Sequence, residues 1–189
     1  MNGLFSVASE LQAFCDAQGW QSCFIGGLAV LRWGEARATR DVDLTLFTGF
    51  GGEARFIDKL LAAYRARLEG AKEFALRSRT LLLASADGSG IDISLAALPF
   101  EERIIERASL FEFDPGASIR TCSAEDLLVM KLFASRPLDL RDAESIALRH
   151  HAELDWAYVE EQLTPLAEAK EDPAILFRMN QLRNPPTGC

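Results

Sequence analysis

The sequence predicts an α+β fold, in which a mixed β-sheet of roughly five strands is flanked by helices on one side and followed by a helical C-terminal lobe. Polar and apolar residues alternate over 40–47 and over 91–96, which is the period of strands with one solvent-facing side. Before these segments, over 4–18, apolar residues recur at helical spacing. Only helical patterns follow residue 122, so we expect a core domain over 1–122 and a helical lobe over 123–189.

The first third of the chain is predicted to alternate between helices and strands. Its first helix ends at Gly19, because glycine suits the left-handed position after a helix. The pair Gly26 and Gly27 closes the first strand and opens a short helix. The expected elements are a helix over 4–18, a strand over 21–25, a helix over 27–32, a strand over 40–47, a glycine-rich loop over 49–52 and a helix over 53–68.

The best hairpin signal of the chain is the turn sequence DGSG at 87–90. It separates a predicted strand over 74–86 from a returning strand over 91–96. The next elements are expected to be a helix over 99–108, with proline in its first turn, and short strands over 110–113 and 119–121.

Helical spacing dominates the rest of the chain. Ser123 stands three residues before Asp126, in the arrangement of a residue that caps a helix N-terminus. Helices are expected from residue 123, over 139–150, over 155–169 and over 173–182, before a proline-rich tail at 184–186.

The charge and cysteine content narrow the class of protein. The net charge of −8 disfavours broad, non-specific binding to nucleic acid, although it leaves room for a local basic face. The four cysteines, Cys15, Cys23, Cys122 and Cys189, lack metal-binding spacing, so we expect reduced thiols in a cytoplasmic protein. No apolar run approaches the roughly 20 residues that span a bilayer, and the N-terminus lacks the basic segment of a signal peptide, so no membrane contact is expected.

Two carboxylates open the predicted strand over 40–47. Asp41 and Asp43 are two residues apart on a strand, so their side chains point the same way, about 6.6 Å apart. Carboxylates in this position repel each other and add nothing to a core, but they suit a hard divalent cation such as Mg²⁺. The sequence therefore predicts that both residues are metal ligands.

The glycine pair before this strand suits phosphate. Gly26 and Gly27 allow a close backbone approach and present N–H groups at a helix N-terminus, where phosphate is favoured. Arg40, directly before Asp41, is the basic residue best placed for a phosphate role.

These residues carry a resemblance to a known superfamily. Gly26-Gly27, a short helix and Arg40-Asp41-Val42-Asp43 resemble the signature of the polymerase-beta-type nucleotidyltransferases. The sequence GGLAV…WGEARATRDVDL resembles that of the bacterial enzymes grouped with the AbiEii toxins of type IV toxin–antitoxin systems. The resemblance extends over about 24–146. It implies a nucleotidyltransferase fold and transfer of a nucleoside monophosphate from a nucleoside triphosphate (NTP), such as ATP, to a hydroxyl group. The resemblance also implies a catalytic role for Asp41 and Asp43, two Mg²⁺ ions, with Mn²⁺ as a substitute, and an antitoxin partner.

Asp92 is a third carboxylate to consider. It is the only acidic residue in an otherwise apolar strand pattern, and burial of an isolated charge is costly. Asp92 is either a carboxylate in water at a strand edge or, as the resemblance implies, the third metal ligand on a neighbouring strand. We favour the metal ligand.

A second part of the resemblance lies in the helical lobe. Lys131 matches the family lysine that contacts nucleotide phosphates, and Asp142 matches the first acid of a paired motif, whose second acid is replaced here by Ser145. Structural roles are the alternatives: Lys131 extends its charge from an apolar helix face into water, and Asp142 stabilises the start of a helix.

Three functions remain open from the sequence. The chain is a toxin-like enzyme that acts on tRNA or another nucleic acid, a small-molecule nucleotidyltransferase of the aminoglycoside-modifying type, or a non-catalytic nucleotide-binding or antitoxin-type module. The negative charge favours a cationic small molecule over a polynucleotide. The intact pair Asp41 and Asp43 argues against the third.

Overall fold

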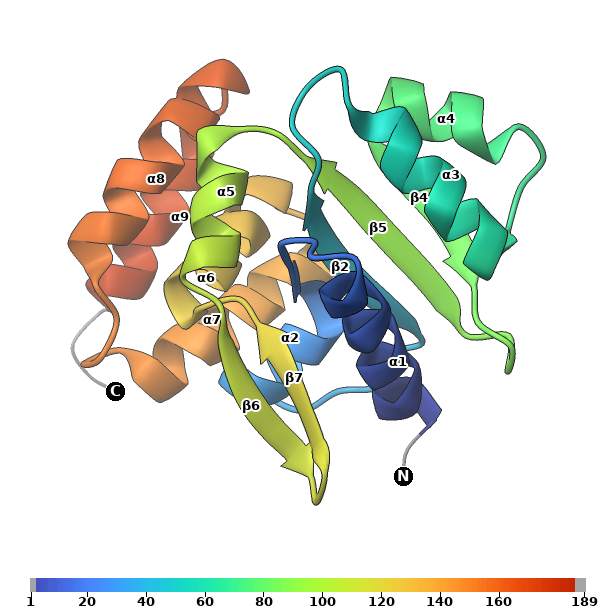
Figure 1. The fold of residues 1–189 in the computed structure, drawn as a ribbon. Coiled ribbons are helices and arrows are strands. Elements are labelled where there is room, and N and C mark those ends of the chain that lie inside the picture. Colours follow the sequence, from blue (N-terminus) through green and yellow to red (C-terminus); the bar gives the residue numbers. More distant parts are fainter. Residues whose placement is uncertain (1–2, 186–189) are drawn as a thin grey trace. The chain divides into compact units, whose positions relative to one another are not determined.

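The computed structural model describes residues 3–185. They divide into two compact units (Figure 1). The first unit, the sheet unit, contains the chain up to Leu28 and Ala38–Cys122. The second, the helical unit, contains Ala29–Arg37 and the chain from Ser123 onward, so 29–37 groups with the C-terminal helices and not with the predicted core domain.

A seven-stranded mixed sheet forms the centre of the sheet unit, which confirms the predicted fold class. The strand order is β3-β4-β5-β2-β1-β7-β6. β2 runs parallel to β5 and β1 parallel to β7, whereas the other neighbours are antiparallel. The strands are β1 (Ser22–Phe24), β2 (Asp41–Phe47), β3 (Arg65–Ala66), β4 (Thr80–Ala84), β5 (Gly90–Ala96), β6 (Ser109–Asp114) and β7 (Ala117–Thr121).

One face of the sheet is the core of this unit. Val42, Leu44 and Leu46 of β2 are fully buried, and their register partners on β5 are the equally buried Ile91, Ile93 and Leu95. Helices α1 and α5 contact β1 and β2, and Figure 1 shows α1 in front of β2. The helices of the unit are α1 (Gly3–Ala17), α3 (Glu53–Ala63), α4 (Ala71–Ser78) and α5 (Pro99–Glu106), and α2 (Gly26–Trp33) begins here. The alternation that predicted β2 and β5 therefore separates a buried face from a polar one.

The segment between α3 and β4 differs from the prediction. The helix expected over 53–68 ends at Ala63, and two residues of β3 follow. The strand expected over 74–86 is wrong in its first half, because 74–78 is the end of α4. Ala71 and Ala75 are buried four residues apart, which is helical spacing, so packing outweighs the apolar composition that suggested a strand.

Arg79 joins α4 to the glycine-rich loop after β2. It ends the helix with a φ of 55°, and its guanidinium donates hydrogen bonds to the Leu95 and Gly49 carbonyl oxygens at 2.8 and 3.1 Å. The same group pairs with Glu53 at 2.5 Å and lies 4.8 Å from the ring centre of the exposed Phe50. One side chain thus fixes the loop over 48–52 to β5.

The helical unit contains the expected helices, α6 (Ala124–Ala134), α7 (Pro137–His150), α8 (Trp156–Ala169) and α9 (Ala174–Arg183). Ser123 caps α6, because its hydroxyl accepts the Asp126 N–H at 3.1 Å. α7 begins two residues earlier than predicted, since Pro137 suits a first helical position.

None of the helices in residues 3–185 is long and apolar enough to cross a membrane. Three of the four cysteines, Cys15, Cys23 and Cys122, are buried thiols. Cys189 and the last proline of the predicted tail lie outside the described residues.

Candidate active site

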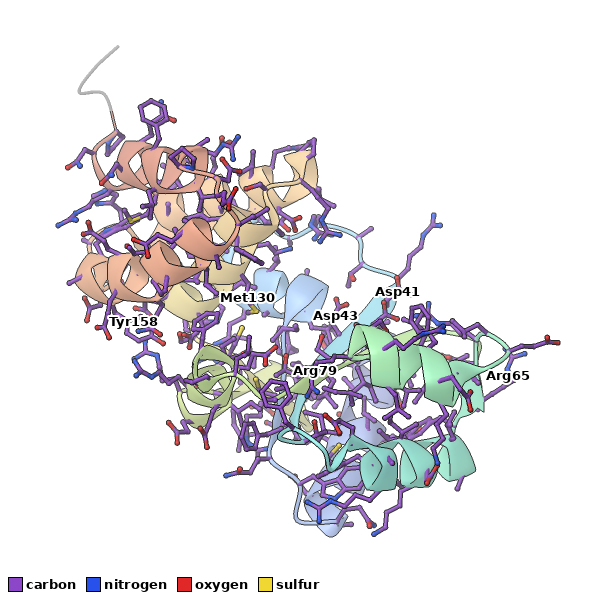
Figure 2. All side chains as sticks on the ribbon, turned by 90° about the horizontal axis from the view of Figure 1, so that it is seen from above. Asp41, Asp43, Arg65, Arg79, Met130 and Tyr158 are labelled. Atoms are coloured by element: carbon purple, nitrogen blue, oxygen red, sulfur yellow. The ribbon has the colours of Figure 1, made fainter. Side chains whose placement is uncertain are left out.

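Three of the predicted site residues lie on neighbouring strands. Asp41 and Asp43 alternate with buried Val42 and Leu44, so both carboxylates lie on the polar face of β2 (Figure 2). Asp92 is the register partner of Asp43 on the parallel strand β5, and adjacent strands are about 4.8 Å apart. The sheet therefore brings Asp41, Asp43 and Asp92 onto one face, although Asp92 is distant from the others in sequence.

The glycine pair lies against this group. Gly26 has a φ of +57°, a conformation that favours glycine, and a Cβ at this position would overlap the Asp43 carboxylate. The Gly27 N–H donates to Asp43 Oδ2 at 3.3 Å, and a Cβ at Gly27 would overlap Thr39. The absence of side chains therefore lets the N-terminus of α2 approach Asp43.

Sequence reasoning missed a cation among these carboxylates. Arg67 Nη2 donates to Asp92 Oδ1, and Arg67 Nη1 lies 3.9 Å from Asp41 Oδ1. Arg67 was hidden because it fell inside the helix predicted over 53–68, whereas it follows β3 in the structure. No local sequence pattern predicts the contact between Arg67 and Asp92.

The donor chemistry at this face fits a divalent cation. Asp41 and Asp92 keep 49% and 35% of their side-chain surface exposed, and oxygen donors of this kind are what Mg²⁺ prefers. As the side chains stand, the described residues contain no group of three His, Cys, Asp or Glu side chains arranged around a metal position. The ionic contacts of Arg67 with two of the carboxylates show that these side chains would need to turn before they bind metal.

The two predicted phosphate cations have different surroundings. Arg40 is exposed, directly before Asp41 on the same unit. Lys131 belongs to the helical unit and is only 7% exposed. Its ammonium group contacts Asp139 Oδ1 at 2.9 Å and Asp142 Oδ2 at 2.8 Å. These contacts make Lys131 part of a buried ion network, and its phosphate contact stays a prediction.

That network is called here the buried ion cluster, because its members Lys131, Asp139 and Asp142 are buried; it also contains Arg37 and the exposed Arg136. Arg37 binds both Asp142 oxygens at 2.8 Å, and Arg136 Nε contacts Asp139 Oδ2 at 2.5 Å. Burial alone would raise the pKa of both carboxyls. Hydrogen bonds and positive charge from Arg37 and Lys131 outweigh it at Asp142, as those from Arg136 and Lys131 do at Asp139, so each pKa is lowered.

Ser145, where the resemblance expects a second acid, makes local contacts. Its hydroxyl donates to the Asp142 carbonyl oxygen at 2.8 Å and accepts the Glu35 N–H at 3.1 Å. A Cβ at Gly34 would lie 2.7 Å from the same hydroxyl. Ser145 therefore holds the 29–37 segment against α7, and the small Gly34 leaves room for it.

Comparison with known proteins identifies a family and similar folds. The family profile described as "Nucleotidyl transferase AbiEii toxin, Type IV TA system" matches residues 14–170. No curated protein matches the chain in sequence. An antigenic nucleotidyltransferase-like protein from Paracoccidioides brasiliensis is similar in structure, with a TM-score of 0.53 and 15% identity, over 94% of this chain and 92% of that one. The antibiotic-resistance factor ANT(2'')-Ia gives a TM-score of 0.53 at 18% identity, over 94% and 96% of the two chains. At these identities the two structures support the fold alone.

Proposed function

This chain belongs to the AbiEii family of nucleotidyltransferases, and we propose that it moves a nucleoside monophosphate from an NTP to a hydroxyl acceptor in a reaction that depends on divalent metal. Nucleotidyl transfer follows from the family. The metal, the acceptor and the roles of single residues are the parts that we propose.

The observation that carries the proposal is the in-register pairing of Asp43 with Asp92 beside Asp41. Three carboxylates on one sheet face repel one another unless positive charge lies among them. A metal site explains the arrangement, since Asp41, Asp43 and Asp92 would supply oxygen ligands to Mg²⁺. When bound, two such ions would activate the attacking hydroxyl and stabilise the leaving pyrophosphate.

The residues around these carboxylates suit a triphosphate. The N–H groups at the start of α2, next to Gly26 and Gly27, would donate to phosphate oxygens. Arg40 would offset phosphate charge from its exposed position beside Asp41. For Lys131 of the helical unit, a phosphate contact would require it to give up part of its contacts with Asp139 and Asp142.

For the acceptor we propose tRNA, and for the biological role a toxin that an antitoxin protein restrains. The family description, a toxin of a type IV toxin–antitoxin system, supports the toxin role. A tRNA acceptor is the alternative that belongs with this role in the sequence analysis. A cationic small molecule is the second candidate, because the net charge of −8 favours a cationic acceptor over a polynucleotide.

The test is incubation of the protein with each labelled NTP, Mg²⁺ and either total tRNA or a panel of aminoglycosides. Label is expected in tRNA with the wild type and not with Asp41→Asn/Asp43→Asn. Label in an aminoglycoside alone would select the second candidate. Transfer by the double variant at the wild-type rate would refute the catalytic role of the two carboxylates.

A further inference from the structure

We propose that Arg67 is an internal counter-ion of the candidate metal site, which holds the Asp41 and Asp92 carboxylates until a divalent cation replaces it. The inference rests on the proposed function, because it takes these carboxylates as metal ligands. It adds a residue that sets how tightly the site binds metal.

The backbone fixes Arg67 in line with the carboxylates. The Arg67 N–H donates to the Leu82 carbonyl oxygen at 3.0 Å, directly after β3 pairs with β4. Leu82 is the register partner of Asp92, and Asp92 is the partner of Asp43. Arg67 therefore continues one row of residues across the sheet, and its place does not depend on side-chain contacts alone.

The guanidinium reaches two carboxylates from this anchor. One terminal nitrogen donates to Asp92 Oδ1, and the other lies 3.9 Å from Asp41 Oδ1. An arginine side chain is charged at all physiological pH values and presents donors in a fixed fork, so it can hydrogen-bond one carboxylate and pair electrostatically with another. In the absence of metal, Arg67 offsets the repulsion among the carboxylates.

Gly90 leaves room for this contact. Gly90 is the register partner of Asp41, and a Cβ there would lie 2.9 Å from Arg67 Nη1 and overlap the Asp41 carboxylate. The Cβ of any other residue at position 90 would collide with both Asp41 and Arg67. The glycine is thus a second, independent feature of the chain that accommodates Arg67 at this place.

Arg67 and a metal ion compete for the same oxygen atoms. A carboxylate oxygen that accepts a guanidinium hydrogen bond must turn toward a cation to bind it, and a positive charge nearby disfavours a second one. The side chains of Arg67, Asp41 and Asp92 are 32%, 49% and 35% exposed, so the exchange requires no unfolding. Apparent metal affinity is reduced by the fraction of molecules in which Arg67 occupies the carboxylates.

The first experiment measures Mn²⁺ binding to the full chain without NTP, by electron paramagnetic resonance of the unbound ion. Arg67→Gln is expected to bind Mn²⁺ about fivefold more tightly, the factor that corresponds to a partly exposed ion pair. Arg67→Lys keeps the charge but loses the fork, so a smaller gain is expected.

Arg65→Gln is the matched control, because Arg65 is an exposed arginine on β3 that Figure 2 shows away from Asp41 and Asp43. It should bind Mn²⁺ as the wild type does. The proposal is overturned if Arg67→Gln binds no more tightly than the wild type, or if Arg65→Gln shows the same gain.

A second experiment tests the pair itself by a double-mutant cycle of Arg67→Gln and Asp92→Asn, with urea unfolding as the readout. The two substitutions should be coupled in EDTA and lose that coupling at saturating Mn²⁺. Additive effects in EDTA would overturn the counter-ion role. Failure of the proposed metal site is distinct, because Asp41→Asn/Asp43→Asn would then bind Mn²⁺ as the wild type does.

Discussion

At the scale of single residues, substitutions in the buried ion cluster should lower stability strongly. Asp142 is 4% exposed and accepts hydrogen bonds from both Arg37 and Lys131. Asp142→Asn leaves these cations without that carboxylate, so we expect unfolding free energy to fall by about 3 kcal/mol or more at pH 7. Asp58→Asn, at the exposed pair with Lys72, should cost under about 1 kcal/mol in the same urea titration.

The same residue predicts a dependence on pH. The folded-state pKa of Asp142 is lowered, so its contribution to stability is present above the ordinary carboxyl pKa of about 4 and is lost as the pH falls through the lowered value. The difference in unfolding free energy between wild type and Asp142→Asn should therefore shrink from pH 5 to pH 3. A difference that stays constant over this range would contradict the lowered pKa.

The glycine pair allows packing and phosphate binding to be separated. Gly27→Ala should destabilise the protein, because its methyl group would overlap Thr39. Addition of Thr39→Gly should restore part of the melting temperature by removing the overlapping atoms. If Gly27 also approaches phosphate, NTP affinity measured by calorimetry stays weak in the double variant. Recovery of both properties together would leave Gly27 with a packing role only.

At the scale of elements, Arg79 decides how firmly the loop over 48–52 is held. Its guanidinium bonds to the Gly49 carbonyl oxygen, Thr48 Oγ1 and Glu53. Arg79→Ala should speed hydrogen exchange of amides in this loop and leave the central strands protected, because the lost contacts are local. Arg77→Ala, at an exposed position in α4, is the control, and its loop amides should exchange as in the wild type.

The start of α6 depends on a capping side chain. Ser123 Oγ accepts the Asp126 N–H and donates to Asp126 Oδ2 at 2.7 Å, and that carboxylate is fully buried. Ser123→Ala should lower the unfolding free energy by about 1–2 kcal/mol, since it removes the cap and a partner of a buried charge. Ser6→Ala, at a half-buried site in α1 where the hydroxyl bonds to the exposed Glu10, should change it little.

At the scale of the whole molecule, ligand binding should appear as stability. A ligand at a hundredfold excess over its Kd stabilises the native state by about 2.7 kcal/mol, which is roughly 5–10 °C for a chain of this size. NTP with Mg²⁺ should raise the melting temperature more than either alone. Asp41→Asn/Asp43→Asn should respond little, and an equal response would argue against these carboxylates as the metal site.

Local patterns made part of this molecule predictable. Alternation identified β2 and β5, and the same alternation placed Asp41, Asp43 and Asp92 on polar faces. Arg67 could not be found this way, because its partners are set by strand order and not by local sequence. The contact of Ser145 with Glu35 was invisible for the same reason, whereas α4 was missed because its apolar residues fit both periods.

The path of the chain between the two units limits where the protein can be truncated or recombined. The 29–37 segment lies early in the sequence but groups with the C-terminal helices, where the Gly34 carbonyl oxygen accepts from Arg149 at 2.5 Å and Arg37 binds Asp142. A truncation after Cys122 would leave this segment without those partners, so an isolated sheet unit should express as a poorly folded fragment. Recombination that exchanges C-terminal lobes between relatives would have to exchange 29–37 as well.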